Sequence, residues 1–171
     1  VQFITFRLGD SLPKNKLREL EELRKKRLST DCKLSEKSRA ESMVDEMDHW
    51  LDKGLGCCLL SDSDKRAKLL RTLLLDDGKR AIFISLVIMP NHVHLLFEPM
   101  IELSKLLQSW KSISARQIAN GPIWQSGYYD RMARNMNDLI TWAKYIRENP
   151  KRLAADSYTL WECEWIRKVL G

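Results

Sequence analysis

The stretch AIFISLVIMPNHVHLLFEP, residues 81–99, decides the fold. Residues 81–89 are almost continuously apolar, which is typical of an interior strand rather than an edge strand. Pro90 and Asn91 form a turn signal, and HVHLLF at 92–97 is a second strand. We therefore expect residues 81–97 to form a hairpin at the centre of a sheet.

The elements on either side complete a simple pattern. They are a strand at 2–8, a helix from 61 or 62 to about 75, a helix at about 103–119, a strand at 124–132 and a helix at about 137–148. The order strand, helix, strand, strand, helix, strand predicts an α+β fold of the ferredoxin-like kind, an antiparallel sheet with helices on one face. The last helix is an extra C-terminal element, and we expect the other face of the sheet to stay free for a partner.

Length and composition indicate one domain. The chain has 171 residues and 44% apolar residues, so residues 1–171 are expected to share one core, with a charge-dense helical elaboration at about 11–56 to which no role is assigned. No apolar run approaches the roughly 20 residues that span a bilayer, and residues 1–8 look like a strand rather than a signal segment. We expect a soluble cytoplasmic protein without a membrane partner. The four cysteines lack metal-ligand spacing and are interpreted as reduced thiols.

The positive charge is concentrated in one part of the chain. Residues 104–152 carry nine basic and three acidic side chains, a surplus equal to the net charge of +6 of the whole protein. Segregated Lys and Arg are typical of a surface that binds a polyanion, because they neutralise phosphates and release counterions. The charge alone is equally compatible with a pair of solvated helices.

Two of the three histidines lie two residues apart, at His92 and His94. On a strand both imidazoles point to the same face, so their ring nitrogens converge as half of a divalent metal site. Two histidines that are buried in the core and hydrogen-bonded there would give the same pattern. Val93, Leu95 and Phe97 would point the other way, toward the helices.

The last helix adds a nucleophile and an oxygen ligand. Tyr145 and Asn149 lie one turn apart on one face, beside an apolar stripe that would pack on the sheet. A metal held by two imidazoles and an amide oxygen could polarise a phosphodiester while the tyrosine attacks phosphorus, and Lys144, Arg147 or Lys151 could help to stabilise its phenolate. A boundary tyrosine and a capping asparagine are the structural alternative.

Three motifs then resemble one family. MPNHVHLL at 89–96 resembles the histidine-hydrophobe-histidine (HUH) motif of single-tyrosine transposases, and WQSGYYDR at 124–131 with YIRENP at 145–150 is similar to the REP-associated tyrosine transposases. The resemblance implies cleavage and rejoining of single-stranded DNA at hairpins through a 5′-phosphotyrosine. It assigns Tyr145 as the nucleophile and His92, His94 and Asn149 as ligands of Mg²⁺ or Mn²⁺. It also implies that the protein is a monomer or homodimer and that it associates with the nucleoid.

Two other functions stay open. The protein could be a domesticated DNA-hairpin-binding protein without cleavage activity, or a metal-dependent hydrolase in which water attacks. Tyr129 is a rival nucleophile, although no ligand lies at a helical offset from it. Residues expected to contact DNA are Lys105, Lys111, Arg116, Trp124, Tyr128, Arg131, Arg134, Arg147 and Lys151. For the aromatic pair Trp124 and Tyr128, a place in the core competes with base stacking.

Overall fold

The computed structural model describes residues 1–13, 15–16, 18–19, 22, 49–51 and 53–171. Most of the predicted elaboration at 11–56 lies outside the described residues. The residues of it that are described at 15–16, 18–19, 22 and 49–51 are helical, as the sequence pattern indicates. Within the described part of the chain, no helix is long and apolar enough to span a bilayer.

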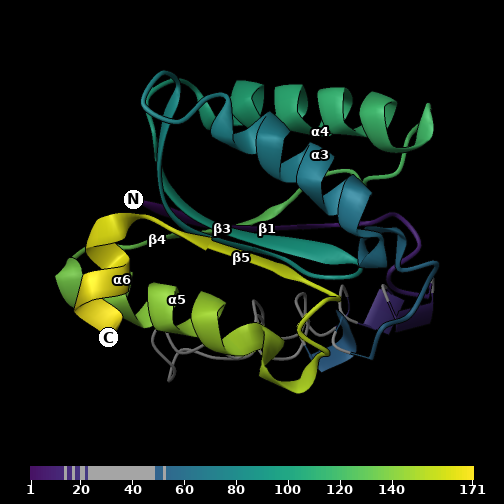
Figure 1. The fold of residues 1–171 in the computed structure, drawn as a ribbon. Helices are drawn as coiled ribbons and strands as arrows, with labels where there is room; N and C mark the ends of the chain where they lie inside the picture. The colour runs from purple at the N-terminus through teal and green to yellow at the C-terminus, as the bar shows by residue number, and fades with distance from the viewer. Residues whose placement is uncertain (14, 17, 20–21, 23–48, 52) are drawn as a thin grey trace.

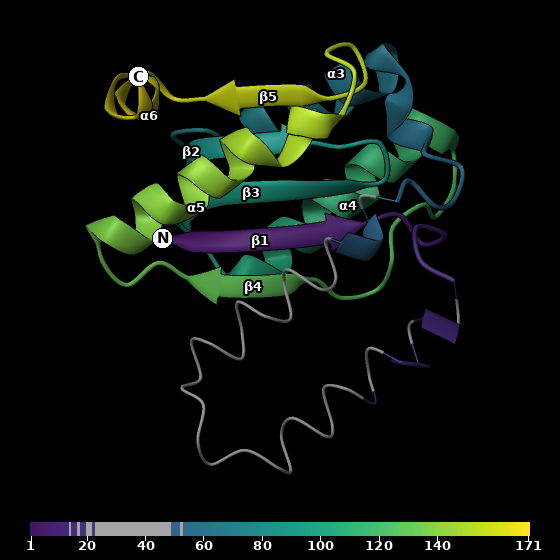
Figure 2. The ribbon, with the colours of Figure 1, turned by 90° about the horizontal axis from the view of Figure 1, so that it is seen from below.

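Five antiparallel strands form one sheet in the order β4-β1-β3-β2-β5 (Figure 2). Their bounds are β1 Gln2–Arg7, β2 Ala81–Ile88, β3 His92–Pro99, β4 Tyr129–Met132 and β5 Thr159–Glu162. The first four strands keep the order of a ferredoxin-like sheet, so the predicted α+β class and the central β2–β3 hairpin are confirmed. A bulge between Phe83 and Ser85 shifts the alternation of β2.

One face of the sheet is covered by α3 (Ser63–Leu74) and α4 (Leu103–Ala119) (Figure 1). The Asp62 side chain caps α3 by accepting hydrogen bonds from the amides of residues 64 and 65. Val93, Leu95 and Phe97 of β3 belong to the core between this face and the two helices. Their predicted direction, opposite to the histidines, is confirmed.

The expectation that the other face stays free is wrong. Helix α5 (Met136–Glu148) lies across that face (Figures 1 and 2). Its buried side chains Leu139, Ala143 and Ile146 belong to the core between α5 and the sheet. Its N-cap is Asn135, whose side chain accepts a hydrogen bond from the amide of residue 138. The amphipathic pattern of α5 predicted a buried stripe, and this second face is the surface against which the stripe is buried.

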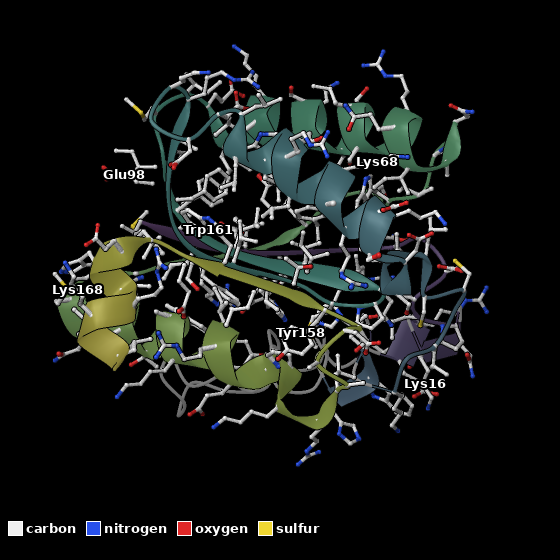
Figure 3. The ribbon with its side chains drawn as sticks, viewed as in Figure 1. Lys16, Lys68, Glu98, Tyr158, Trp161 and Lys168 are labelled. Carbon is white, nitrogen blue, oxygen red and sulfur yellow. The ribbon has the colours of Figure 1, made fainter. Side chains whose placement is uncertain are left out.

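The C-terminal part adds elements that the sequence pattern did not predict. A short 3-10 turn, Asn149–Arg152, follows α5. Strand β5 then pairs with β2 at the edge of the sheet, and α6 (Glu164–Leu170) follows β5. Trp161 lies on the α3–α4 side of β5 and Tyr158 on the α5 side (Figure 3). The buried guanidinium of Arg66 ties this segment to α3 by donating to the Asp156 carbonyl and the Thr159 hydroxyl.

One further local prediction needs correction. The strand predicted at 124–132 is only the four residues of β4, because Trp124 forms no more than an isolated bridge to Leu8. Before α3, the apolar segment at 57–60 leads into the 3-10 turn Leu59–Ser61. The cysteines described by the structure, at 57, 58 and 163, are free thiols, as expected, whereas Cys32 lies outside the described residues.

Candidate active site

His92 and His94 form the centre of the site. Both project from β3 toward α5, and the two Nε2 atoms lie 3.1 Å apart. A bond from a divalent metal to a histidine nitrogen is about 2.0–2.1 Å long, so one cation can contact both atoms. The convergence predicted from the spacing of the two residues is therefore present in the fold.

A side-chain oxygen holds the other nitrogen of each ring. Oδ1 of Asn91 lies 2.7 Å from Nδ1 of His92, and Oγ1 of Thr5 lies 2.8 Å from Nδ1 of His94. Thr5 is the β1 partner of His94 in the sheet register, whereas Asn91 directly precedes β3. Outer contacts of this kind orient metal-binding imidazoles in proteins.

Burial keeps both rings neutral. Their exposed fractions are 1% for His92 and 0% for His94. Burial lowers the pKa of His92 to about 3, and burial together with the neighbouring His92 lowers the pKa of His94 well below its usual value. A neutral imidazole has a lone pair available for a metal, so the electrostatics of the pair suit metal binding.

Tyr145 of α5 lies directly against this pair. Its ring meets the His94 ring edge to face with 5.6 Å between centroids, and it makes similar contacts with Phe3 and Trp142. Phe3 in turn stacks on Trp142 at 4.3 Å and on His94 at 5.5 Å. The aromatic cluster fixes the position of the tyrosine at the edge of the helix–sheet seam, where the sequence predicts it.

Asn149 supplies a further polar atom. It is the C-cap of α5, and its backbone N–H donates to the Tyr145 carbonyl. Its side-chain Oδ1 is buried without a hydrogen-bond partner among the described residues. A buried carbonyl oxygen without a donor is costly, and a cation would satisfy it. The described residues contain no cluster of three or more His, Cys, Asp or Glu that could hold a metal. Two imidazoles and this amide oxygen are a donor set that fits a divalent cation, and the ligand role of Asn149 stays a prediction.

Most of the residues predicted to contact DNA lie at the surface. Lys105 and Lys151 are well exposed, and each forms an ion pair within its own turn, with Glu102 and Glu148. Tyr128 is 41% exposed. Arg116, Arg131 and Arg134 are on α4, on β4 and just before α5. All six side chains remain candidates for contact with a nucleic acid.

Three other predicted contacts have partners inside the protein. Lys111 donates to the carbonyls of Gln125 and Gly127, and burial, followed by the charge of Arg7, lowers its pKa to about 8. Trp124 packs edge to face on Phe6 and donates to the Ser114 hydroxyl, as its alternative place in the core predicts. Arg147 forms a bidentate pair with Glu162.

The sequence pattern does not identify the residues that support the histidines. It indicates Asn91 only as part of a turn, and Thr5 only as part of a strand. The signal for Thr5 lies in strand pairing, which puts Thr5 beside His94 and Arg7 beside His92. No local pattern identifies Asn91, because its amide contacts Leu51 and Leu55, far away in the sequence.

A comparison with protein-family models matches residues 63–149 to the family described as "Transposase IS200 like". The chain belongs to the IS200-like transposase family. The matched residues run from α3 through α5 to its C-cap, so they include both histidines, Tyr145 and Asn149. Residues 1–62 and 150–171 lie outside this match.

A comparison with curated proteins found no match. Among solved structures, a REP-associated tyrosine transposase bound to a REP hairpin is similar to this transposase, with a TM-score of 0.47 and 14% sequence identity. The similarity covers 88% of this chain and 66% of the other, so this chain spans just under two thirds of that protein.

Proposed function

We propose that this transposase is a metal-dependent single-stranded DNA endonuclease and strand transferase that acts at hairpin sequences through a 5′-phosphotyrosine intermediate. The observation that carries the proposal is the contact of the Tyr145 ring with His94, whose Nε2 lies 3.1 Å from Nε2 of His92. A nucleophile and two metal-binding nitrogens come together from α5 and β3. One chain supplies all three groups, so a monomer can form the site.

His92, His94 and Asn149 would hold the metal, which we propose to be Mg²⁺ or Mn²⁺. When bound, it would supply a Lewis acid that withdraws charge from a non-bridging phosphate oxygen. The neutral state of the two imidazoles and the unpaired Oδ1 of Asn149 support these roles. The remaining chemistry belongs to the residues of the chain.

Tyr145 would act as the nucleophile. Its oxygen forms a bond to phosphorus while the bond from phosphorus to the 3′ oxygen of the preceding nucleotide breaks, so the 5′ phosphate stays on the tyrosine. The phenolic proton passes to water, and the departing 3′ oxygen takes up a proton from water. Attack by a 3′ hydroxyl on the phosphotyrosine reverses these steps and rejoins DNA without a nucleotide cofactor.

The aromatic cluster prepares the nucleophile. Phe3 and Trp142 each meet the Tyr145 ring edge to face, with 5.8 Å between centroids, and so restrict its position. A fixed ring loses little conformational freedom when the phosphate arrives, which favours a near-attack geometry.

Positive charge on the surface would bind the DNA. Membership of the transposase family and the surplus of basic residues at 104–152 support a nucleic-acid substrate. We assign phosphate contacts to Lys105, Arg116, Arg131, Arg134 and Lys151, and base stacking to Tyr128. With such a substrate, we expect the enzyme to act on nucleoid DNA in the cytoplasm.

The test uses single-stranded hairpin oligonucleotides taken from repeats that flank the coding region. With Mg²⁺ or Mn²⁺ we expect a protein–DNA adduct that survives denaturation, and none in Tyr145→Phe. Tyr129→Phe is the matched control, because it removes the same hydroxyl from the rival tyrosine on β4 and should leave the adduct unchanged.

Two other outcomes overturn the proposal. Binding without any cut, in the wild type and in Tyr145→Phe alike, would identify a hairpin-binding protein that does not cleave. Cleavage that persists in Tyr145→Phe would show that water attacks instead.

A further inference from the structure

The site contains a group that the proposed chemistry does not use. Asn91 touches His92 on one side and the backbone of Leu51 and Leu55 on the other. Its Nδ2 donates to the carbonyls of Leu51, at 3.0 Å, and Leu55, at 3.3 Å. Asn91 is 1% exposed, so water does not compete for these bonds.

These contacts fix which way the amide points. Two carbonyl oxygens can be satisfied only by N–H groups, so the nitrogen of the Asn91 amide must face Leu51 and Leu55. The amide oxygen then faces Nδ1 of His92 at 2.7 Å, and a carbonyl oxygen can only accept. It follows that Nδ1 of His92 carries the proton and that Nε2 of this neutral ring is bare.

From this geometry we infer that Asn91 is a positioning residue that holds the proton of His92 on Nδ1 and keeps Nε2 free for the metal, with the carbonyls of Leu51 and Leu55 fixing its orientation. The inference rests on the proposed metal site for its purpose. It also gives the end of the 11–56 elaboration a role, which is to support the metal-binding histidine from outside the family-matched residues.

The second imidazole is held in a different way. Nε2 of His92 is bare and lies 3.1 Å from Nε2 of His94, so in the metal-free protein His94 must supply the proton between them. Nδ1 of His94 then accepts from the Thr5 hydroxyl, which can either donate or accept. Metal binding therefore requires a change of tautomer at His94 only, because Asn91 has already fixed His92.

The first test needs no variant and no metal. Nitrogen NMR of the imidazoles in the metal-free wild type distinguishes a protonated ring nitrogen from a bare one. We expect a protonated Nδ1 and a bare Nε2 for His92. A proton on Nε2 of His92 would overturn the inference, whatever the protein does with metal or DNA.

Variants then test the positioning role, with Mn²⁺ alone as the probe. Asn91→Ala should release the His92 tautomer and weaken Mn²⁺ binding about 10–100-fold. Asn91→Asp keeps an acceptor for Nδ1 but replaces the two donors with a charged oxygen that faces the carbonyls of Leu51 and Leu55, so it should keep the His92 tautomer at a cost in stability. If Asn91→Ala changes neither the tautomer nor the affinity, the inference is wrong.

The result also separates this inference from the proposed function. If the wild type shows the expected tautomer, and Asn91→Ala loses it, but Mn²⁺ does not bind the wild type, then the metal-dependent function fails while the control of His92 by Asn91 stands. If Mn²⁺ binds the wild type and Asn91→Ala equally, the function survives and the positioning role fails.

Discussion

Arg147 and Glu162 join α5 to β5 through two parallel hydrogen bonds, 2.9 Å from Nε to Oε1 and 2.7 Å from Nη2 to Oε2. The pair connects the helix that carries Tyr145 to the strand at the sheet edge. Planar bidentate pairs of this kind are stronger and more directional than single contacts. The hydrogen bonds of Glu162, together with its charge, raise the pKa of Arg147.

Glu162→Gln should therefore disturb both stability and catalysis. We expect a loss of about 1 kcal/mol in the free energy of unfolding, between the values for exposed and buried pairs. The rate of adduct formation should fall more than hairpin binding, because α5 loses a fixed orientation. Denaturant unfolding and adduct kinetics measure these effects. Glu164→Gln, which neutralises the exposed partner of Lys168, is the matched control and should change neither.

Thr5→Val should weaken Mn²⁺ binding about 10–100-fold. Valine keeps the shape of threonine but leaves Nδ1–H of metal-bound His94 without an acceptor. Thr5→Ser keeps the hydroxyl and should bind Mn²⁺ nearly as the wild type does. Titration calorimetry of the three proteins decides the point, and equal affinities for valine and serine would contradict it.

Asp76 should make the fold sensitive to acid. Burial by itself raises the pKa of this carboxyl, but hydrogen bonds from Arg80 and Trp110 outweigh burial and leave the pKa below its ordinary value of 3.8. The folded state therefore binds fewer protons than the unfolded state, and the contribution of Asp76 is lost as the pH falls below about 3.8.

We expect Asp76→Asn to lower the free energy of unfolding at neutral pH by about 1–3 kcal/mol. The difference from the wild type should shrink at lower pH, because the wild-type carboxyl then becomes neutral too. Urea unfolding at several pH values measures this difference. The exposed variant Asp156→Asn should show no such trend, and a constant difference for Asp76→Asn would contradict the assignment.

Lys111 should make stability depend on pH in the alkaline range. Its pKa of about 8 in the folded protein lies below the ordinary lysine value of 10.5, so between these values the unfolded state binds more protons. Stability should rise with pH across this window, and the rise should be smaller in Lys111→Met, measured by unfolding from pH 7 to 10. If the difference in unfolding free energy between wild type and variant did not depend on pH, the burial of this charge would be refuted.

Trp124 and Tyr128 should separate stability from DNA binding. Trp124→Ala removes a ring that packs on Phe6, and we expect it to cost about 2–3 kcal/mol of unfolding free energy. Tyr128→Ala should leave stability nearly unchanged and weaken hairpin binding by about 1–3 kcal/mol if a base stacks there. Fluorescence anisotropy and thermal unfolding of both variants test this division of roles.

The sequence predicted the elements with strong periodicity and failed where the signal was short or non-local. The bounds of α4 match the expected 103–119, and the β2–β3 hairpin lies where an apolar run and a turn indicate it. β5 is only four residues long, so no window of alternation identifies it. The apolar stripe of α5 predicts that the helix is buried along one side. It does not indicate against which face of the sheet the helix packs.

The site shows the same division. The two-residue spacing of His92 and His94 and the one-turn spacing of Tyr145 and Asn149 are local, so they could be predicted. Lys111 looks like any surface lysine in the sequence, and its contacts with Gln125 and Gly127 depend on the packing of a loop against α4. Asn91 could not be recognised for the same reason, because its partners Leu51 and Leu55 come from a distant segment.

The pairing of β5 with β2 protects the protein from self-association. Without β5, residues 85–88 would present unpaired amides and carbonyls along an apolar strand, and such an edge readily recruits another polypeptide. Residues 159–162, which lie beyond the family match, thus shield this edge, and a chain that ended before β5 would be expected to lose solubility.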